Sequence, residues 1–280
     1  MTSIFDQPLI FDGGLGTHLE ARGNDISGDL WSAAIVRDKP EEVRAAHEDF
    51  FRAGAQVATS CSYQVTFEAL GEEAETLLRR SVELARQAAG DRLVAASVGP
   101  YGAGPGAGTD YDGAYGIGKQ ELKEWHRRRF EVLASTDADF LLAETIPNLD
   151  EVAALLELAD ATSKPFALSL TGVLAADPNA VEQAIQLMRG AKNLGTVGVN
   201  CVGADVAERV VGQLKELGIP VLAYPNSGEV WDHIARTWRR ESDAIPGLVE
   251  AAPALRAAGA TLMGGCCRTT PEQIAQLASV

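Results

Sequence analysis

Short apolar segments alternate with longer amphipathic segments along the whole chain. The apolar segments are rich in Val, Leu, Ala and Phe and are bounded by turn-forming residues, which is typical of buried strands. The amphipathic segments repeat apolar residues at helical spacing, as at Leu78, Val82, Ala85 and Ala89. We expect strands at 9–11, 56–59, 93–98, 140–143, 166–170, 197–199, 221–224 and 261–263.

Eight strand–helix units in regular alternation predict an α/β fold, a single (β/α)8 TIM barrel. Several helical patterns end in a glycine that suits a C-cap, at Gly54, Gly218 and Gly259. A dinucleotide-binding fold would need a third glycine in the first turn, which residues 12–17 lack. Nothing in the pattern divides the chain, so we expect one domain over residues 1–280.

Two longer segments interrupt the alternation. The first is the glycine-rich stretch from Tyr101 to Gly118, and the second runs from Asn226 to Ser242 and carries Trp231 and Trp238. Both follow predicted strands, so we expect both at the end of the barrel where the active sites of this fold lie.

The chain is acidic, with a net charge of -15 over 280 residues. This charge disfavours nucleic acid as a partner, because phosphate binding needs clustered Lys and Arg. The one basic run, 126–129, lies in a helical pattern, and we interpret it as a solvated helix face.

No signal peptide and no membrane span are expected, because the N-terminus lacks a basic region and no apolar stretch is long enough. Four cysteines are too few for a disulfide scaffold, so free thiols in a reducing cytoplasm are the simplest setting.

Cysteines occur at the ends of two predicted strands. Cys201 ends one strand, and Cys266 and Cys267 follow another directly after Gly264 and Gly265. A catalytic zinc needs three protein ligands and one open position, which three thiols supply. The alternative is that cysteine serves as a small buried hydrophobe, and without a CxxC pair the spacing leaves both open. For both adjacent sulfurs to reach one metal, the chain must leave strand geometry, and the two glycines allow this.

Residues at the other strand ends limit which classes of reaction we expect. None of the six lysines lies at a strand end, which argues against Schiff-base aldolase chemistry. His47 and His126 fall inside helical patterns, and His18 is a weak candidate. Asp12 and Glu144 end two apolar strands, where each either caps the following helix or binds a cationic group of a substrate.

The sequence blocks around these cysteines and around Asp12 and Glu144 resemble the homocysteine S-methyltransferase family. Within that family they are similar to the class that uses S-methylmethionine or S-adenosylmethionine. The resemblance covers nearly the whole chain and is most specific in Asn200-Cys201 and in the block from Gly264 to Pro271. It implies a zinc held by Cys201, Cys266 and Cys267, with Cys61 not a ligand. The other matching blocks are Asp12-Gly13-Gly14, Trp31-Ser32-Ala33, Gly54-Ala55, Ser62-Tyr63-Gln64, Ser97 to Gly102, Glu144-Thr145, Gly198-Val199 and Tyr224 to Glu229.

The resemblance also implies that Asp12 and Glu144 help to bind the amino-acid end of homocysteine. Within the matching blocks we assign substrate binding to Asp12, Gly13, Tyr63, Glu144 and Asn226. The aromatic residues Trp31, Tyr63, Tyr101 and Trp231 either pack or face a sulfonium cation.

The site itself favours alkyl transfer. Coordination to zinc deprotonates a substrate thiol, and three cysteine thiolates leave the metal electron-rich and a poor Lewis acid for hydrolysis. The sequence therefore predicts methyl transfer from a small sulfonium donor to homocysteine, forming methionine. We favour S-methylmethionine over S-adenosylmethionine because of the match at 224–229. Two alternatives are a phosphate-binding barrel lyase, with Gly264 and Gly265 as its anion loop, and a zinc- or thiol-binding module without methyltransferase activity.

Overall fold

The computed structural model describes residues 3–26, 28, 30–104, 109–232, 237–239 and 246–279, with the backbone alone described at 230–232 and 237–239. The side chains of Trp231 and Trp238 therefore lie outside the described part, as does His233.

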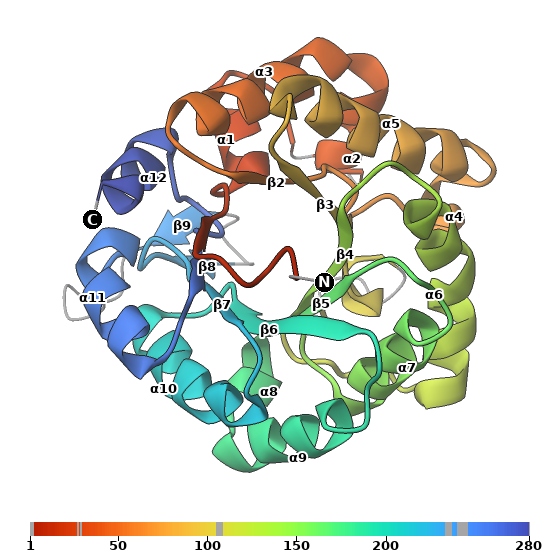
Figure 1. Ribbon diagram of the computed structural model, residues 1–280. Helices are drawn as coiled ribbons and strands as arrows, with labels where there is room; N and C mark the ends of the chain where they lie inside the picture. Colours follow the sequence, from red (N-terminus) through yellow and green to blue (C-terminus); the bar gives the residue numbers. More distant parts are fainter. Residues whose placement is uncertain are drawn as a thin grey trace.

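Eight parallel strands form the barrel, in the order β1-β10-β7-β6-β5-β4-β3-β2. A parallel bridge from Phe11 to Val57 joins the two ends of this sheet and closes the ring, which Figure 1 shows along its axis. The fold expected from the sequence is confirmed. The barrel strands are β1 (Leu9–Ile10), β2 (Val57–Thr59), β3 (Leu93–Val98), β4 (Phe140–Ile146), β5 (Phe166–Leu170), β6 (Leu194–Asn200), β7 (Val221–Tyr224) and β10 (Leu262–Met263).

Helices surround the barrel and cover its outer face (Figure 1). They are α1 (Leu15–Ala21), α2 (Ser32–Asp38), α3 (Pro40–Arg52), α4 (Phe67–Leu70), α5 (Glu73–Ala89), α6 (Lys119–Ala134), α7 (Leu149–Ala159), α8 (Gly172–Ala176), α9 (Pro178–Met188), α10 (Ala204–Leu214), α11 (Leu248–Ala258) and α12 (Pro271–Ala278), with 3-10 turns η1 (Tyr101–Ala103) and η2 (Lys215–Leu217). The three glycines expected to end helices all have positive φ, 104° at Gly54, 71° at Gly218 and 130° at Gly259. No described helix is long and apolar enough to cross a membrane.

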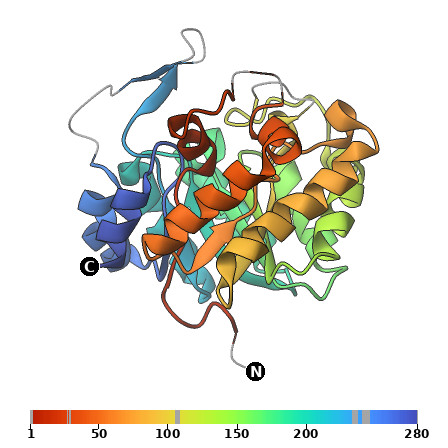
Figure 2. The same ribbon diagram turned by 90° about the horizontal axis from the view of Figure 1, so that it is seen from above.

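Each of the eight predicted strands is present, with small shifts at the ends. The strand β4 is longer than expected and runs through Glu144 to Ile146. The second predicted insertion also contains an antiparallel pair, β8 (Val230–Asp232) and β9 (Thr237–Arg239). In Figure 2 this pair projects from the end of the barrel opposite to the N-terminal segment.

The apolar core has two parts. One fills the space between the strands and the helices, and the other fills the barrel interior. Phe5 lies in the N-terminal segment, is 1% exposed and packs edge-on against Phe140 at 4.9 Å between ring centroids. The N-terminal segment thus closes the amino end of the barrel, and the chemistry is left to the carboxyl end.

The interpretation of the basic run 126–129 as a solvated face is wrong for two of its four residues. Arg127 is partly exposed and pairs with Glu124, and Arg128 is exposed and pairs with Glu72. His126 and Arg129 are buried, at 0% and 1% exposure. The helix α6 turns by about 100° per residue, so the side chains at 126 and 129 lie on its inner face while those between them point outward.

Candidate active site

The three cysteines converge at the carboxyl end of the barrel. The ligand atoms of Cys201, Cys266 and Cys267 all lie within 4.8 Å of one another. Cys201 follows β6, and the other two follow β10, which is two strands away with β7 between them. Three sulfurs at this spacing match the donor set of a thiolate zinc site, in which the metal lies about 2.3 Å from each sulfur.

In this structure Cys201 and Cys266 are joined as a disulfide, where the sequence analysis expects free thiols. The Cys267 sulfur lies 3.9 Å from that of Cys201 and is not bonded to it. Zinc binds cysteine as the free thiolate. The bonded pair would have to be reduced before all three sulfurs can bind a metal ion.

Backbone geometry directs these sulfurs inward. Cys201 has a φ of 51° and Arg268, directly after Cys267, has a φ of 65°. A non-glycine residue in the left-handed region is uncommon and concentrates at functional sites. At both places the chain turns sharply out of strand geometry, as the sequence analysis expects of the Cys266–Cys267 pair.

Gly264 and Gly265 serve a different purpose from the one predicted, because neither of them has positive φ. A Cβ atom on Gly264 would lie 2.6 Å from that of Phe11, and Gly265 packs directly against Thr269. On the facing strand end, a Cβ on Gly14 would lie 2.5 Å from the carbonyl oxygen of Cys266. The glycines therefore let the first and last strand ends pack backbone to backbone around the cysteines.

Cys61 stays apart from the cluster, as the sequence analysis expects. It is buried, and its thiol lies 3.8 Å from the Ser32 carbonyl oxygen. Burial raises the pKa of this thiol to about 11, which leaves it protonated and unreactive at neutral pH.

Asp12 is a buried carboxylate at the end of β1. It accepts hydrogen bonds from the backbone N–H and the hydroxyl of Thr59, at 2.7 and 3.0 Å. Burial raises its pKa to about 8 despite these two bonds, and the nearby Glu144 adds to the increase. Among the described residues no cationic side chain is paired with it, so it does not serve as half of an internal ion pair.

Glu144 lies in β4 across the barrel mouth. Its carboxylate accepts a short hydrogen bond from the Ser97 hydroxyl. Burial raises its pKa to about 7, against the opposing effects of Ser97, Tyr224 and the positive charge of Arg129. Two buried carboxylates whose charge lacks a direct ion-pair partner would be stabilised in their ionised form by a cationic group placed between them.

Two further polar groups in this region have buried atoms without a hydrogen-bond partner among the described residues. The Tyr224 hydroxyl lies near Ser169 and Glu144, and the other is the side-chain oxygen of Asn226. The Asn226 backbone N–H bonds to Val202 O at 3.0 Å, so the residue itself is held in place. Buried polar atoms are normally satisfied, so the Asn226 oxygen could accept a hydrogen bond from a bound molecule, whereas the Tyr224 hydroxyl faces Glu144 and Ser169.

Tyr63 follows β2 and is directed toward the same region. Its hydroxyl donates to Asp110 at 3.3 Å, and its pKa is raised by burial and by the carboxylates of Asp110 and Glu144. Gly13 contributes by its small size, because a Cβ there would lie 2.5 Å from the Thr269 carbonyl oxygen. All five predicted substrate-binding residues thus lie at the carboxyl end of the barrel.

Arg129 is a residue of the site region that the sequence analysis missed. Its guanidinium donates to the carbonyl oxygens of Gly99, Ser62 and Tyr63, at 3.0, 2.9 and 2.7 Å. It thereby ties the loop after β2, which carries Tyr63, to the loop after β3. Its burial could have been predicted from the helical periodicity of the sequence. Positions 122, 126, 129 and 133 share one face of α6, and Leu122 and Leu133 are buried on that face.

The remaining candidates have structural partners. His18 bonds to Asp49 at 2.9 Å on the outer helices, and His126 bonds to the buried Glu151 at 2.8 Å. Tyr101 packs edge-on against Trp125 at 5.1 Å, in keeping with the packing interpretation. Trp31 is partly buried against the core and has a φ of 46°.

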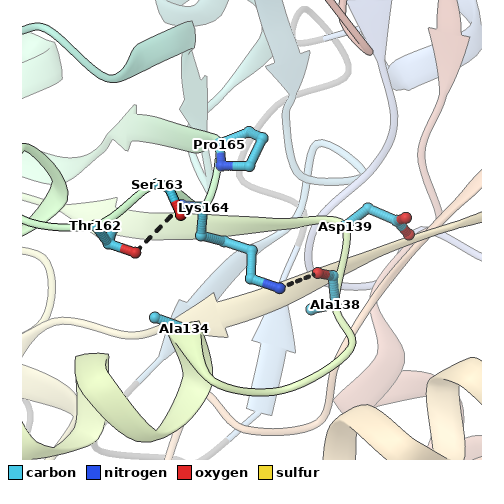
Figure 3. Close-up of a pocket in the computed structure, with 7 residues that line it drawn as sticks. All are labelled: Ala134, Ala138, Asp139, Thr162, Ser163, Lys164 and Pro165. Carbon is cyan, nitrogen blue, oxygen red and sulfur yellow. Dashed lines mark hydrogen bonds between the residues drawn. The ribbon is translucent and has the colours of Figure 1, made fainter.

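A separate cavity lies at the opposite end of the barrel, where β4 and β5 begin (Figure 3). Its one lysine, Lys164, donates to the carbonyl oxygens of Thr136 and Ala138 at 2.8 and 2.7 Å. The lysine is occupied in joining two loops, and the cavity is far from the cysteines. We therefore place the candidate active site at the carboxyl end alone.

Comparison with known proteins gives consistent matches over almost the full chain. The model of the family described as homocysteine S-methyltransferase matches residues 9–280. The homocysteine S-methyltransferase of Escherichia coli (strain K12) is 39% identical, over 96% of this chain and 94% of that protein. The crystal structure of the homocysteine methyltransferase MmuM from Escherichia coli has a TM-score of 0.84 in its oxidized form, at 36% identity, covering 97% of this chain and 95% of that one. Its metallated form also has a TM-score of 0.84, at 35% identity, covering 98% and 96%.

Proposed function

The chain belongs to the homocysteine S-methyltransferase family, and from this premise we propose that it transfers a methyl group from a sulfonium donor to homocysteine held on zinc. Methyl transfer to homocysteine follows from the family. The zinc ion, the donor and the roles of individual residues are the proposed parts. The alternatives of a phosphate-binding lyase and of a binding module without activity are wrong, because the family match covers residues 9–280.

The observation that carries the proposal is the convergence of Cys201, Cys266 and Cys267 from two strand ends. Once reduced, they offer three thiolates and leave one position for the sulfur of homocysteine. Zinc bound there would supply the deprotonation of that thiol, whose pKa in water is close to 8.5, the approximate value for free cysteine. We propose one zinc per chain.

Asp12 and Glu144 are proposed to bind the amino-acid end of homocysteine. Both are buried next to the cysteine cluster, and both have a pKa raised toward neutrality while no cation is present. An ammonium group between them would restore their ionised forms. Gly13 is proposed to act through its small size, which lets the end of β1 pack against the Thr269 carbonyl oxygen, and Asn226 and Tyr63 are proposed to contribute polar side-chain atoms.

The donor is proposed to be a small sulfonium compound, and S-methylmethionine is favoured over S-adenosylmethionine. Attack by the acceptor thiolate on the methyl carbon forms one C–S bond and breaks another. The bonding electron pair stays on the donor sulfur, which becomes a neutral thioether. With S-methylmethionine as donor, both products are methionine.

We further propose that residues 1–280 act as a single zinc methyltransferase domain in a reducing cytoplasm. A reducing compartment favours this function because zinc binds cysteine as the free thiolate.

The test measures methionine formed from homocysteine by the reduced, zinc-loaded protein, with S-methylmethionine, S-adenosylmethionine, betaine or methyltetrahydrofolate as donor. We expect activity with the two sulfonium compounds and the higher rate with S-methylmethionine. A higher rate with betaine or methyltetrahydrofolate would overturn the donor assignment.

A further inference from the structure

Glu151 is a fully buried carboxylate outside the set of residues assigned to the site above. It lies in the first turn of α7 and is 0% exposed. The carboxylate accepts three hydrogen bonds, from Tyr101 N at 2.6 Å, from the Tyr115 hydroxyl at 2.9 Å and from His126 Nε2 at 2.8 Å. Burying a charge is costly unless hydrogen bonds compensate for it. Hydrogen bonds to a carboxylate are stronger than those between neutral groups, so Glu151 holds its three donors firmly.

Two of these donors belong to the two ends of one segment, the chain between β3 and α6. Tyr101 lies near its start and Tyr115 near its end, and they bond to different oxygens of Glu151. Their rings are also in contact, with 5.2 Å between centroids. Asn148, which caps α7, donates to Gly113 O at 2.9 Å. The start of α7 thus holds the described parts of this segment, 99–104 and 109–118, at three points.

The segment held in this way contacts Tyr63, one of the proposed substrate-binding residues. Asp110 accepts a hydrogen bond from the Tyr63 hydroxyl at 3.3 Å. Near the start of the segment, a Cβ on Gly99 would lie 2.5 Å from the Tyr63 carbonyl oxygen, so the two backbones are in direct contact. The segment therefore contacts Tyr63 at both its backbone and its hydroxyl, and the place of the segment sets the place of this side chain.

Glu151 is also joined to elements that carry other groups of the site. The helix α7 follows β4, and only residues 147 and 148 separate the two. Glu144, the proposed partner of the substrate ammonium, lies in β4, so both carboxylates belong to one strand–helix unit. On α6, His126 bonds to Glu151, and Arg129 one turn later donates to Tyr63 O at 2.7 Å. The hydrogen bonds of Glu151 thus join α6, α7 and the segment into one support for Tyr63.

We propose that Glu151 is a positioning residue for homocysteine binding, which acts through Tyr101 and Tyr115 to hold Tyr63 in its place. Glu151 does not touch the substrate, because its side chain is fully buried. The inference rests on the proposed function, in which Tyr63 contacts homocysteine, and it requires no particular methyl donor. A positioning role of this kind predicts weaker substrate binding with little change in the chemical step, since the reacting groups stay where they are.

The experiment replaces Glu151 with Met, which has a similar length but no carboxylate oxygens, and with Gln, which keeps one acceptor oxygen. Steady-state kinetics use the full-length, reduced, zinc-loaded protein with homocysteine and S-methylmethionine. We expect Glu151→Met to raise the homocysteine KM about fivefold or more while kcat changes by less than about twofold, because binding is lost equally in the ground state and the transition state. Glu151→Gln should recover most of the affinity, with a KM within about twofold of that of the unaltered protein.

Glu157→Met is the matched control. Glu157 lies on the same helix and also joins it to α6, through Lys119 and Lys123 at 2.8 and 2.6 Å. These ion pairs are on the surface and involve neither Tyr101 nor Tyr115, so both kinetic constants should stay unchanged. A second variant, Tyr115→Phe, removes one bond to the carboxylate and keeps the ring. It should raise the homocysteine KM by a smaller factor than Glu151→Met, and it tests the inference if Glu151→Met does not fold.

Two further measurements separate positioning from folding. Hydrogen exchange without substrate, followed by mass spectrometry, should be faster in Glu151→Met at 99–104 and 109–118 and unchanged in β5 and β6, whereas a loss of overall stability would speed exchange in all of them. Tyr63→Phe combined with Glu151→Met should raise the homocysteine KM by less than the product of the two separate factors. The reason is that both substitutions act on the same contact.

An unchanged homocysteine KM in Glu151→Met, or in Tyr115→Phe where Glu151→Met does not fold, would overturn the inference. So would a fall in kcat with KM unchanged, which is the mark of a purely structural role, or an equal increase of KM in Glu157→Met. Failure of the proposed function is a different result, in which the unaltered protein forms no methionine from homocysteine with any sulfonium donor.

Discussion

Asn200 and Thr145 exchange two hydrogen bonds across the barrel mouth. The Asn200 side-chain oxygen accepts from Thr145 N at 2.9 Å, and its nitrogen donates to the Thr145 hydroxyl at 2.8 Å. Thr145 has a φ of 61° and directly follows Glu144, while Asn200 directly precedes Cys201. One buried amide therefore holds a strained residue beside the proposed ammonium site and is anchored beside a proposed metal ligand.

Asn200→Ala should lower the free energy of unfolding by about 1–3 kcal/mol, because it leaves buried donors on Thr145 and Ser169 without an acceptor. Denaturant unfolding measures this loss. Ser169→Ala removes only one partner of the same oxygen and should cost less. We also expect Asn200→Ala to weaken zinc retention against a chelator, as is usual when a neighbour of a ligand is lost. Equal stability of Asn200→Ala and the unaltered protein would contradict the role of this pair.

Replacing any one of Cys201, Cys266 and Cys267 by Ser should abolish methyl transfer and reduce bound zinc. The reason is that two remaining thiolates do not complete the ligand set. Metal analysis of the reduced protein measures the zinc. Cys61→Ala is the matched control and should keep both zinc and activity, because this thiol is buried away from the cluster. Full zinc content in a double variant lacking Cys266 and Cys267 would refute the assignment.

Asp12→Asn and Glu144→Gln should each weaken homocysteine binding by about ten- to a hundredfold, from the loss of a charge-assisted contact of about 1.5–3 kcal/mol. Zinc content should not change, because neither carboxylate belongs to the cysteine cluster. Calorimetric titration of the zinc-loaded variants with homocysteine measures the effect. If homocysteine affinity survives both substitutions, the carboxylates are structural.

The same carboxylates predict how stability depends on pH in the substrate-free protein. The pKa of Asp12 rises from 3.8 to about 8 on folding, and that of Glu144 from 4.5 to about 7. Between these limits the folded state binds more protons than the unfolded state, so stability is highest at low pH and falls as pH rises through this window. The slope is at most about 1.4 kcal/mol per pH unit for each group. Unfolding measured from about pH 5 to about pH 8 should show the decline, and the Asp12→Asn, Glu144→Gln double variant should lose it.

Arg129→Met should raise the KM for homocysteine or the donor by a larger factor than it lowers the zinc content. The reason is that the loops that carry Tyr63 and Gly99 lose their common anchor. Arg129→Lys keeps the charge but lacks the planar guanidinium that reaches three carbonyl oxygens. We therefore expect its thermal stability to be closer to that of the unaltered protein than its KM is. Arg128→Met is the matched control on the same helix, since its side chain is exposed and pairs with Glu72. Kinetic constants and thermal melts of the three variants separate positioning from folding. A KM as high in Arg128→Met as in Arg129→Met would rule out a specific role.

The sequence predicted the barrel and the cysteine set because both depend on local signals. Apolar runs of strand length marked each of the eight strands, and parallel strands place their carboxyl ends together. The paired amide of Asn200 was not predictable in this way, because its partner Thr145 lies two strands away and depends on the register of β4, β5 and β6.

The two glycines before Cys266 show a second limit of prediction from the sequence. Gly264 and Gly265 were assigned a role in backbone freedom, which is what glycine usually supplies in isolation. Their actual role is to leave space for Phe11 and Thr269, and this follows only from the packing of the first strand end on the last. Likewise, the burial of Arg129 follows from helical phase, but its three carbonyl partners follow from two loops distant in sequence.

The pairing of β1 with β10 has a consequence for how the protein is made. Asp12 lies near the start of the chain, whereas Cys266 and Cys267 follow the strand that closes the ring. During synthesis, seven barrel strands leave the ribosome with the seam between β1 and β7 still open and two of the three thiols not yet added. A metal ion held by all three proposed ligands could therefore bind only after residues 266 and 267 have been made, which would place metal binding among the last steps in the assembly of the barrel.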